Sequence, residues 1–418
     1  MATQDVPGLV EHLFRREAGK MVSYLTRLFG FSRLNLAEDV VQDTLHQALQ
    51  TWSMRGLPDN PSAWLMRVAR NRAIDLIRRD DHFRNLAPAL AELQQREAAP
   101  DEPVSEREIQ DDQLRMMFAC CHPGLSAEVQ ISLILKTLCG LSVSEIAKAL
   151  LASPDAIEKR LGRARTFLRE AGTLAELTHP TDLPVRVTAV YQAIYLLFNE
   201  GYHGSQSERT VREDLCFEAL RLALLLSEHP AGARPATFAL VALFCFDAAR
   251  LPGRVDAAGF LIPLEQQDRS TWDQELIARG FSYLERSASQ TEVSALHLEA
   301  GIAALHSSAP AYERTDWPGI VELYDRLYGL TPTPIVALNR AIAVGQAQGP
   351  AAGLRELETI AAVSMLKQYP FYPAAQGEFH RLAGHTAAAR TCFEQALRLA
   401  RNPAEVRYLE RKLEALQI

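Results

Sequence analysis

The residue types best suited to metal binding or nucleophilic chemistry are the cysteines and histidines. The chain has 6 cysteines and 11 histidines, and their densest group is the run Cys120-Cys121-His122. Neighbouring residues of a regular helix point in different directions, so this run cannot present two thiolates to one ion. The sequence also contains no CxxC pair, which zinc sites of this ligand type usually have. We therefore expect buried free thiols in a reducing compartment, no bound metal and no cofactor.

Two polar clusters in the C-terminal half combine carboxylates with aromatic and basic side chains. Their members are Asn199, Glu200, Tyr202, His203, Asp268, Arg269, Trp272 and Asp273. Paired carboxylates can carry out acid–base catalysis, and either cluster could instead bind a peptide or a small ligand. No nucleophile-elbow, P-loop or HExxH motif accompanies them, and polar residues at helix ends usually cap or bridge helices. We expect a structural use for both clusters and no catalytic residue, with peptide or ligand binding as the alternative.

Cations recur along residues 154–170, where they could neutralise DNA phosphates. They are Lys159, Arg160, Arg163, Arg165 and Arg169. Between them runs the apolar stripe of one helix, formed by Ile157, Leu161, Ala164 and Leu168. Upstream, Ser142 and Glu145 form a capping box, while Ser153 and Pro154 open the basic helix. Two capped helices with a basic second member indicate a helix-turn-helix that reads the major groove; a solvated surface helix is the alternative.

A second basic helix is predicted over residues 61–79. Beside its inner apolar face this helix carries an aromatic residue at its start and a set of basic and polar residues, namely Trp64, Arg67, Arg70, Asn71, Arg72, Asp75, Arg78 and Arg79. Cations mixed with an aromatic ring and an amide suit unpaired DNA, because cations hold phosphates and an aromatic ring stacks on bases. The preceding loop, residues 53–61, contains two prolines and a glycine and could hold an extruded base. For Trp64 the alternative is an ordinary place in the core.

An acidic and polar stripe is predicted on the helix over residues 37–52. Its members are Asp39, Gln42, Asp43 and His46, which recur at helical spacing. A separate apolar stripe contains Val41, Leu45, Ala48 and Trp52. Taken alone, the polar stripe is typical of a solvated face whose acids suit the helix N-terminus.

Helices must position all of these stripes, and the whole sequence is typical of an all-α protein. Strand-like alternation is hard to find. We expect two small helical domains, at residues 7–83 and 113–170, joined by a flexible acidic linker at residues 84–112. A connector at residues 171–184 then leads into a large helical domain at residues 185–418.

The large C-terminal domain shows weak repetition of the tetratricopeptide type. After Gly384, the residues Ala389, Phe393 and Ala396 have the spacing of a repeat in which small residues let helices approach. An irregular all-helical domain is the alternative. The longest apolar patch, Phe238 to Phe246, is shorter than the roughly 18 residues of a membrane span. We expect a buried helix there, no signal peptide and no membrane contact.

The net charge of -7 is unevenly distributed along the chain. Residues 1–80 and 113–170 are mildly basic, whereas residues 85–112 and 171–418 are acidic. The acidic C-terminal half could therefore cover the basic DNA-reading helices at rest, and salt would weaken this cover.

The order of the N-terminal motifs resembles the sigma-70 family of bacterial transcription initiation factors, specifically its extracytoplasmic-function (ECF) type. AEDVVQDTLHQAL is similar to the family's segment that docks on the clamp helices of the largest polymerase subunit. NPSAWLMRVARNRAIDLIRR is similar to the segment that melts and reads the minus-ten element. LSVSEIAKALLASPDAIEKRLGRAR is similar to the domain that reads the minus-thirty-five element. The resemblance covers residues 7–170.

This resemblance implies three sets of binding residues. Core RNA polymerase would be contacted by Asp39, Gln42, Asp43 and His46. Minus-ten DNA would be contacted by Trp64, Arg67, Arg70, Asn71, Asp75, Arg78 and Arg79. Minus-thirty-five DNA would be contacted by Ser153, Lys159, Arg160, Arg163 and Arg165. Asn71 would sit where the family holds a flipped base, and Glu158 replaces a residue that is often basic in the family.

The C-terminal half resembles the extension of one group of ECF sigma factors. The segments AIYLLFNEGY, QQDRSTWD and TPTPIVALNRAIAV carry this resemblance. In that group a tetratricopeptide-like extension is thought to regulate the factor in place of a membrane anti-sigma protein. The resemblance implies a cytoplasmic protein whose extension could receive a protein or small-molecule signal. The alternatives are a helix-turn-helix regulator that senses a ligand and never binds core polymerase, and an adaptor or enzyme with a vestigial DNA module.

Overall fold

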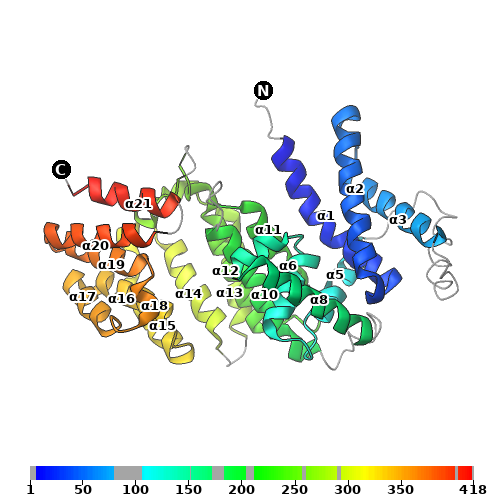
Figure 1. The fold of residues 1–418 in the computed structure, drawn as a ribbon. Coiled ribbons are helices and arrows are strands. Elements are labelled where there is room, and N and C mark those ends of the chain that lie inside the picture. Colours follow the sequence, from blue (N-terminus) through cyan, green and yellow to red (C-terminus); the bar gives the residue numbers. More distant parts are fainter. Residues whose placement is uncertain are drawn as a thin grey trace. The chain divides into compact units, whose positions relative to one another are not determined.

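The structure is a computed structural model in which most of the chain is helical (Figure 1). The described residues are 6–79, 106–150, 152–171, 183–203, 211–256, 260–289, 293–400 and 403–416. Among these residues the only extended pairing is an isolated bridge between Val255 and Leu261. The chain divides into two compact units, which are residues 1–197 with 228–232 and residues 198–227 with 233–418. The all-α fold predicted from the sequence is confirmed.

Unit 1 contains the helices that carry the predicted binding stripes. They are α1 (Val6–Phe29), the 3-10 helix η1 (Phe31–Arg33), α2 (Leu34–Arg55), α3 (Pro61–Arg79), α5 (Glu106–Cys120), α6 (Ala127–Thr137), α7 (Val143–Ala149) and α8 (Pro154–Ala171). Helix α10 (Leu183–His203) begins in unit 1 and continues into unit 2. Helix α1 packs against α2, α3, α5 and α6, and it buries Met21, Tyr24 and Leu25 completely. It is therefore the central support of unit 1.

Of the predicted linker at residues 84–112, the structure describes only residues 106–112. Helix α5 begins at Glu106, and Asp112 is only 2% exposed. Residues 106–112 therefore belong to a packed helix, and the linker prediction is wrong for them. Their acidic composition suggested a solvated segment, but Asp112 accepts a hydrogen bond from Arg27 of α1 at 2.9 Å. That contact lies 85 residues apart in sequence and could not be read from local composition.

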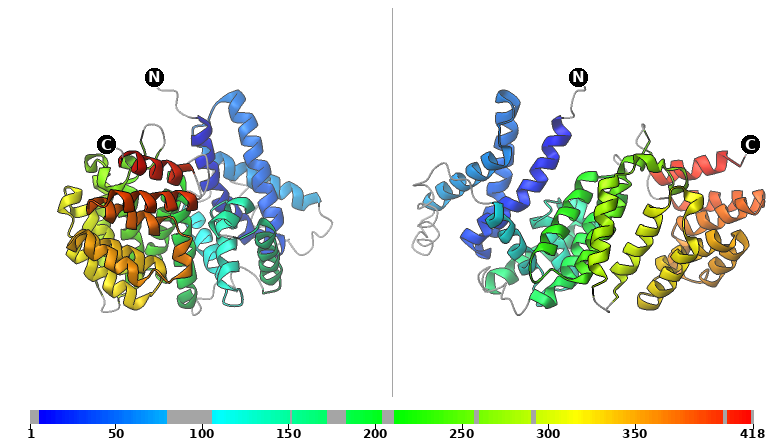
Figure 2. Two further views of the ribbon diagram at one scale, coloured as in Figure 1. Left: turned by 60° about the vertical axis from the view of Figure 1, so that its left-hand side comes forward. Right: turned by 180° about the vertical axis from the view of Figure 1, so that it is seen from behind.

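Unit 2 is a succession of helices (Figure 2). They are α11 (Glu213–Glu228), α12 (Pro235–Ala249), α13 (Gln274–Ser287), α14 (Ala295–Ser308), α15 (Trp317–Leu330), α16 (Pro334–Gln348), α17 (Pro350–Thr359), α18 (Ser364–Lys367), α19 (Phe371–Leu382), α20 (Thr386–Leu399) and α21 (Pro403–Glu414). Between them, the described residues also form the 3-10 helices η3 (Leu251–Gly253), η4 (Leu264–Gln266), η5 (Arg269–Thr271) and η6 (Tyr312–Arg314). Helices adjacent in sequence pack on one another, as α15 does on α16 and α19 on α20.

The helix pair α19–α20 shows why small residues recur in the C-terminal sequence. Ala389, Phe393 and Ala396 are fully buried, as their spacing predicted. The Phe393 ring lies against Gly377 of α19, where an added Cβ would meet it at 2.9 Å. The glycine thus makes room for the ring, which is how small residues let paired helices approach.

The most apolar helix among the described residues, α12, lies in the core of unit 2. Pro235–Gly253 is long and apolar enough to cross a membrane. The patch Phe238–Phe246, which was considered in the sequence, is shorter and did not indicate this. However, 72% of its most apolar window is buried in the protein. Leu240, Phe244 and Phe246 of α12 are among the buried residues. The expectation of a buried helix over Phe238–Phe246 is confirmed by this packing.

Candidate nucleic-acid interface

Helix α2 presents the acidic stripe on an open face. Asp39, Gln42, Asp43 and His46 are all exposed. The opposite face of α2 packs on α1 and α3, and its residues Val41 and Ala48 are buried. The 3.6-residue period therefore separates a packed face from a polar face that is free to meet a partner.

An ion pair joins this stripe to the basic helix α3. Arg72 donates a hydrogen bond from Nη2 to Oδ2 of Asp43 at 2.6 Å. The two side chains are 40% and 56% exposed. Exposed pairs of this kind contribute about 0–1 kcal/mol. Asp43 can therefore exchange Arg72 for a cation of a partner at little cost.

Helix α3 places three of its predicted DNA contacts on one exposed face. Arg67, Asn71 and Asp75 recur at spacings of one helical turn and are exposed. The opposite face is closed, with Leu65 and Ala73 fully buried. For Arg78 and Arg79 the side chains lie outside the described residues.

Two predicted minus-ten contacts are less open than the others. Arg70 is only 7% exposed. Trp64 is half-buried, and its ring lies 5.5 Å from that of Trp52, which in turn packs on Phe14 at 5.5 Å. The aromatic cluster therefore uses Trp64 to join α3 to α2, as its core alternative predicted. A further role of these two side chains in DNA contact stays a prediction.

The loop between α2 and α3 is open where a base-binding pocket was predicted. Helix α2 runs on to Arg55, so the loop proper is shorter than the predicted segment. Met54 and Leu57 are 79% and 47% exposed. Asn60 accepts a hydrogen bond from the Ala63 amide at 3.0 Å and so caps α3. The described loop thus offers exposed apolar side chains beside the basic face of α3.

The capped helix pair α7–α8 forms as the sequence predicted. The Ser142 amide donates to Glu145 Oε2 at 2.7 Å, and the Glu145 amide donates to Ser142 Oγ at 3.2 Å. The Ser153 hydroxyl accepts from the Ala156 amide at 3.2 Å, directly before α8. The four residues of the predicted apolar stripe of α8 are buried, namely Ile157, Leu161, Ala164 and Leu168. The helix-turn-helix frame is therefore confirmed, and Ser153 caps its basic helix.

The cations of α8 fall into two groups. Lys159 and Arg163 are exposed, as a phosphate-binding face requires. Arg160 donates to Glu128 of α6 at 2.5 Å. The Glu128 side chain is 70% exposed, so this pair is open to solvent.

Arg165 makes the contact least expected from the sequence. Its Nη2 donates to Glu38 Oε2 on α2 at 2.5 Å, across a sequence separation of 127 residues. Burial raises the pKa of Glu38, while the positive charge of Arg165 acts in the opposite direction. Glu38 and Glu128 had no signal in the sequence as partners of α8, because no local spacing connects them to it.

The polar clusters of the C-terminal half have structural partners. Asp268 and Asp273 accept backbone hydrogen bonds as caps of η5 and α13. Arg269 donates to the carbonyls of His306 and Ala309, at 2.6 and 2.5 Å. Its guanidinium also lies 4.9 Å from the centre of the Trp272 ring. The second cluster therefore holds η5 against the end of α14.

Tyr202, from the first cluster, is also part of a packed arrangement. The guanidinium of Arg254 lies 3.6 Å from the centre of the Tyr202 ring. The same arginine donates to the Tyr202 carbonyl at 3.0 Å. These contacts match the structural use that was predicted for the cluster.

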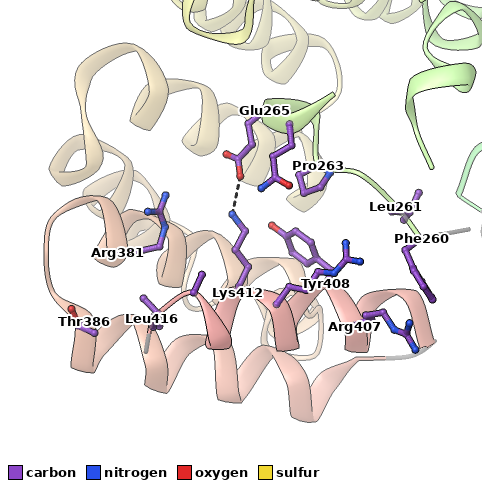
Figure 3. A pocket seen from close by; sticks show the side chains of 13 residues that line it. Phe260, Leu261, Pro263, Glu265, Arg381, Thr386, Arg407, Tyr408, Lys412 and Leu416 are labelled. Carbon is purple, nitrogen blue, oxygen red and sulfur yellow. Dashed lines mark hydrogen bonds and ion pairs between the residues drawn. The ribbon is translucent and has the colours of Figure 1, made fainter. Parts of the chain in front are cut away.

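A pocket of about 450 Å³ opens beside helix α21 (Figure 3). Lys412 points toward Glu265, and its amine lies 2.9 Å from that carboxylate and 3.0 Å from Glu378. Arg411 pairs with Asp256 at 3.2 Å. Because these cations already have carboxylate partners, the pocket wall acts first as a tie between α21 and the preceding helices.

In the described part of the chain, the metal-ligating residue types are scattered, and the thiols of Cys120 and Cys121 are buried. No group of three or more histidine, cysteine or carboxylate side chains there could hold a metal ion. Burial raises the pKa of the Cys120 thiol to about 12, and Cys121 shifts in the same direction for the same reason. Both thiols therefore stay protonated at neutral pH, so neither is a ready nucleophile.

Comparison with known families gives three matches along the chain. Residues 13–83 match the family described as sigma-70 region 2, and residues 115–168 match sigma-70 region 4. Residues 186–288 match a family of unknown function, DUF6596. No solved structure matches the chain.

Individual relatives agree with these matches. An uncharacterized protein of Rhizobium meliloti is 38% identical over 92% of this chain and 91% of its own length. The ECF RNA polymerase sigma factor SigL of Mycobacterium tuberculosis is 33% identical over 40% of this chain and 90% of its own length. The ferric citrate uptake sigma factor FecI of Escherichia coli is 29% identical over 39% of this chain and 90% of its own length.

Proposed function

Because the chain belongs to the extracytoplasmic-function group of the sigma-70 family, we propose that it directs promoter-specific initiation through the exposed stripes of α2, α3 and α8. Membership implies that it binds core RNA polymerase and promoter DNA as an initiation factor rather than as an enzyme. The observation that supports this assignment most is the order of a region 2 match and a region 4 match, each with exposed polar side chains among its predicted contacts.

Polymerase binding is assigned to the acidic stripe of α2. Asp39, Gln42, Asp43 and His46 form its exposed face. Carboxylates on an exposed helix face suit a basic partner surface, such as the clamp helices expected from the resemblance. The pair between Asp43 and Arg72 is exposed and can be exchanged for a partner cation.

Promoter reading is divided between α3 and α8. On α3, Arg67 and Asn71 are exposed, and we propose that they hold the phosphates and a base of opened minus-ten DNA. On α8, Lys159 and Arg163 are exposed, and we propose that they contact duplex DNA at the minus-thirty-five element.

We also propose that the protein is cytoplasmic and that its C-terminal extension regulates this activity. Its first helix is tied to the region 4 match inside unit 1, since Arg186 is 3% exposed and donates to the Phe118 carbonyl at 3.1 Å. A protein or small molecule that binds the extension would act on the helix-turn-helix domain through this contact.

The assignment is tested by run-off transcription with core polymerase on a promoter selected with this protein. Lys159→Glu with Arg163→Glu is expected to lower output at least tenfold, because two phosphate contacts become repulsive. Lys367→Glu, at an exposed lysine in unit 2, is the control and should leave output within twofold. No transcription by the unaltered protein, despite DNA binding, would contradict the assignment and favour a helix-turn-helix regulator that does not use core polymerase.

A further inference from the structure

The two promoter-reading domains touch each other within unit 1. The contact that involves function directly is the ion pair between Arg165 of α8 and Glu38 of α2. Their side chains are 27% and 17% exposed, so water screens the pair less than it screens the surface pair of Asp43 and Arg72. One partner lies in the region 2 match and the other in the region 4 match.

Backbone packing shows that this ion pair belongs to an extended contact. Gly19 of α1 lies against the end of α6, and a Cβ at this position would come within 2.1 Å of the Leu138 carbonyl oxygen. No side chain fits at that distance, so the two backbones approach as closely as glycine permits. Helix α1 also holds α5 through Arg27 and Asp112 at 2.9 Å. Region 4 is thus docked on region 2 by packing, and the ion pair between Arg165 and Glu38 adds to this contact.

Docking and DNA binding make competing demands on the same side chain. Arg165 is one of the cations expected to contact the minus-thirty-five duplex, yet its Nη2 is held by Glu38. A guanidinium engaged by a carboxylate contributes less to a phosphate, because the negative charge beside it offsets its own. The carboxylate also repels the DNA backbone.

We propose that the free chain holds region 4 docked on region 2 with Arg165 engaged by Glu38, and that DNA must displace this contact. Glu38 then limits the intrinsic affinity of α8 for duplex DNA. Glu38 is also next to Asp39 in the sequence. A partner that binds the acidic stripe therefore contacts α2 directly beside the ion pair that DNA must displace. This inference rests on the proposed role of α8 as the helix that reads duplex DNA.

The first test measures the affinity of the full chain for a duplex of random sequence by fluorescence anisotropy at low salt. Glu38→Gln is expected to tighten binding roughly three- to tenfold, because a charged hydrogen bond that competes with DNA is removed. Glu394→Gln is the control, since Glu394 is an exposed acid of α20 in unit 2 and lies outside every proposed contact set. It should change the affinity less than twofold. Equal effects of the two variants would overturn the proposal, because then only net charge matters.

The second test detects docking without DNA. Dyes on Gln50→Cys and Glu170→Cys, two exposed positions on α2 and α8, report the distance between the domains by energy transfer. Cys392 is replaced by serine, since the other five cysteines are buried. Glu38→Arg should lower the transfer, and Glu38→Arg with Arg165→Glu should restore it. Unchanged transfer in Glu38→Arg would overturn the proposal.

Neither test contains polymerase, so a failure here leaves the assignment as a sigma factor untouched. Conversely, if polymerase binding fails while both tests succeed, the docked state stands and only the initiation role is lost.

Discussion

His306, near the end of α14, is held in its neutral form by its surroundings. Burial lowers its pKa to about 3, and the nearby positive charges of Arg250 and Arg269 act in the same direction. Its ring meets the edge of Trp317 at 5.3 Å, and its carbonyl accepts from Arg269 at 2.6 Å. This histidine is therefore part of the packing that joins α14 to η5 and α15.

The lowered pKa predicts an acid-labile unit 2. Since the folded-state pKa lies below the unfolded value, the unfolded chain binds more protons below about pH 6.5, and stability falls as the pH falls toward 3. At pH 5 this effect costs about 2 kcal/mol. His306→Gln should lessen the loss of thermal midpoint between pH 7 and pH 5, as measured by scanning calorimetry. The same pH dependence in the variant and the unaltered protein would show that His306 is not responsible.

At the scale of elements, helix packing in unit 2 depends on glycines that face aromatic rings. The Phe379 ring of α19 enters a niche between α16 and α17. A Cβ would come within 2.1 Å of the ring at Gly345 and within 2.5 Å at Gly353. Phe379 is 1% exposed and belongs to a core cluster with Leu338 and Leu357. The close approach of these three helices thus depends on the absence of two side chains.

Gly345→Ala is therefore expected to destabilise unit 2 by about 1–3 kcal/mol, because the ring or a helix has to shift. Gly329→Ala in α15 is the control. It meets nothing within 4 Å, and alanine is favoured over glycine in a helix by up to about 1 kcal/mol. Urea unfolding followed by circular dichroism compares the two variants. A Gly345→Ala protein as stable as Gly329→Ala would refute the packing argument.

Elements and their faces could be predicted from the sequence where the signal is local. The capping box at Ser142 and the buried stripe through Ile157 both form as their spacing indicated. The start of α5 could not be predicted, since Asp112 is buried by a contact with Arg27 that is distant in sequence. Burial of Arg70 was likewise hidden, because helical periodicity describes one helix and not the neighbours that cover it.

At the scale of the whole molecule, contacts between segments that are distant in sequence could not be predicted. The opposed charges of Glu38 and Arg165 are separated by 127 residues, and only the fold brings them together. The tie between Arg186 and Phe118 has the same character, with a separation of 68 residues. A cover of the basic helices by the acidic C-terminal half stays a prediction. Regulation within this chain is therefore expected to act through contacts that local sequence patterns do not reveal.

The acidic stripe of α2 is expected to bind core RNA polymerase. The measurement is the dissociation constant of the full-length protein for core polymerase, with Asp39→Arg plus Asp43→Arg compared with Asp59→Arg. The stripe variant is expected to bind at least tenfold more weakly, because two attractive contacts become repulsive at the interface. The control should bind like the unaltered protein. Tight binding by the stripe variant would contradict the placement of the interface on α2, and no binding by the unaltered protein would contradict its action as a sigma factor.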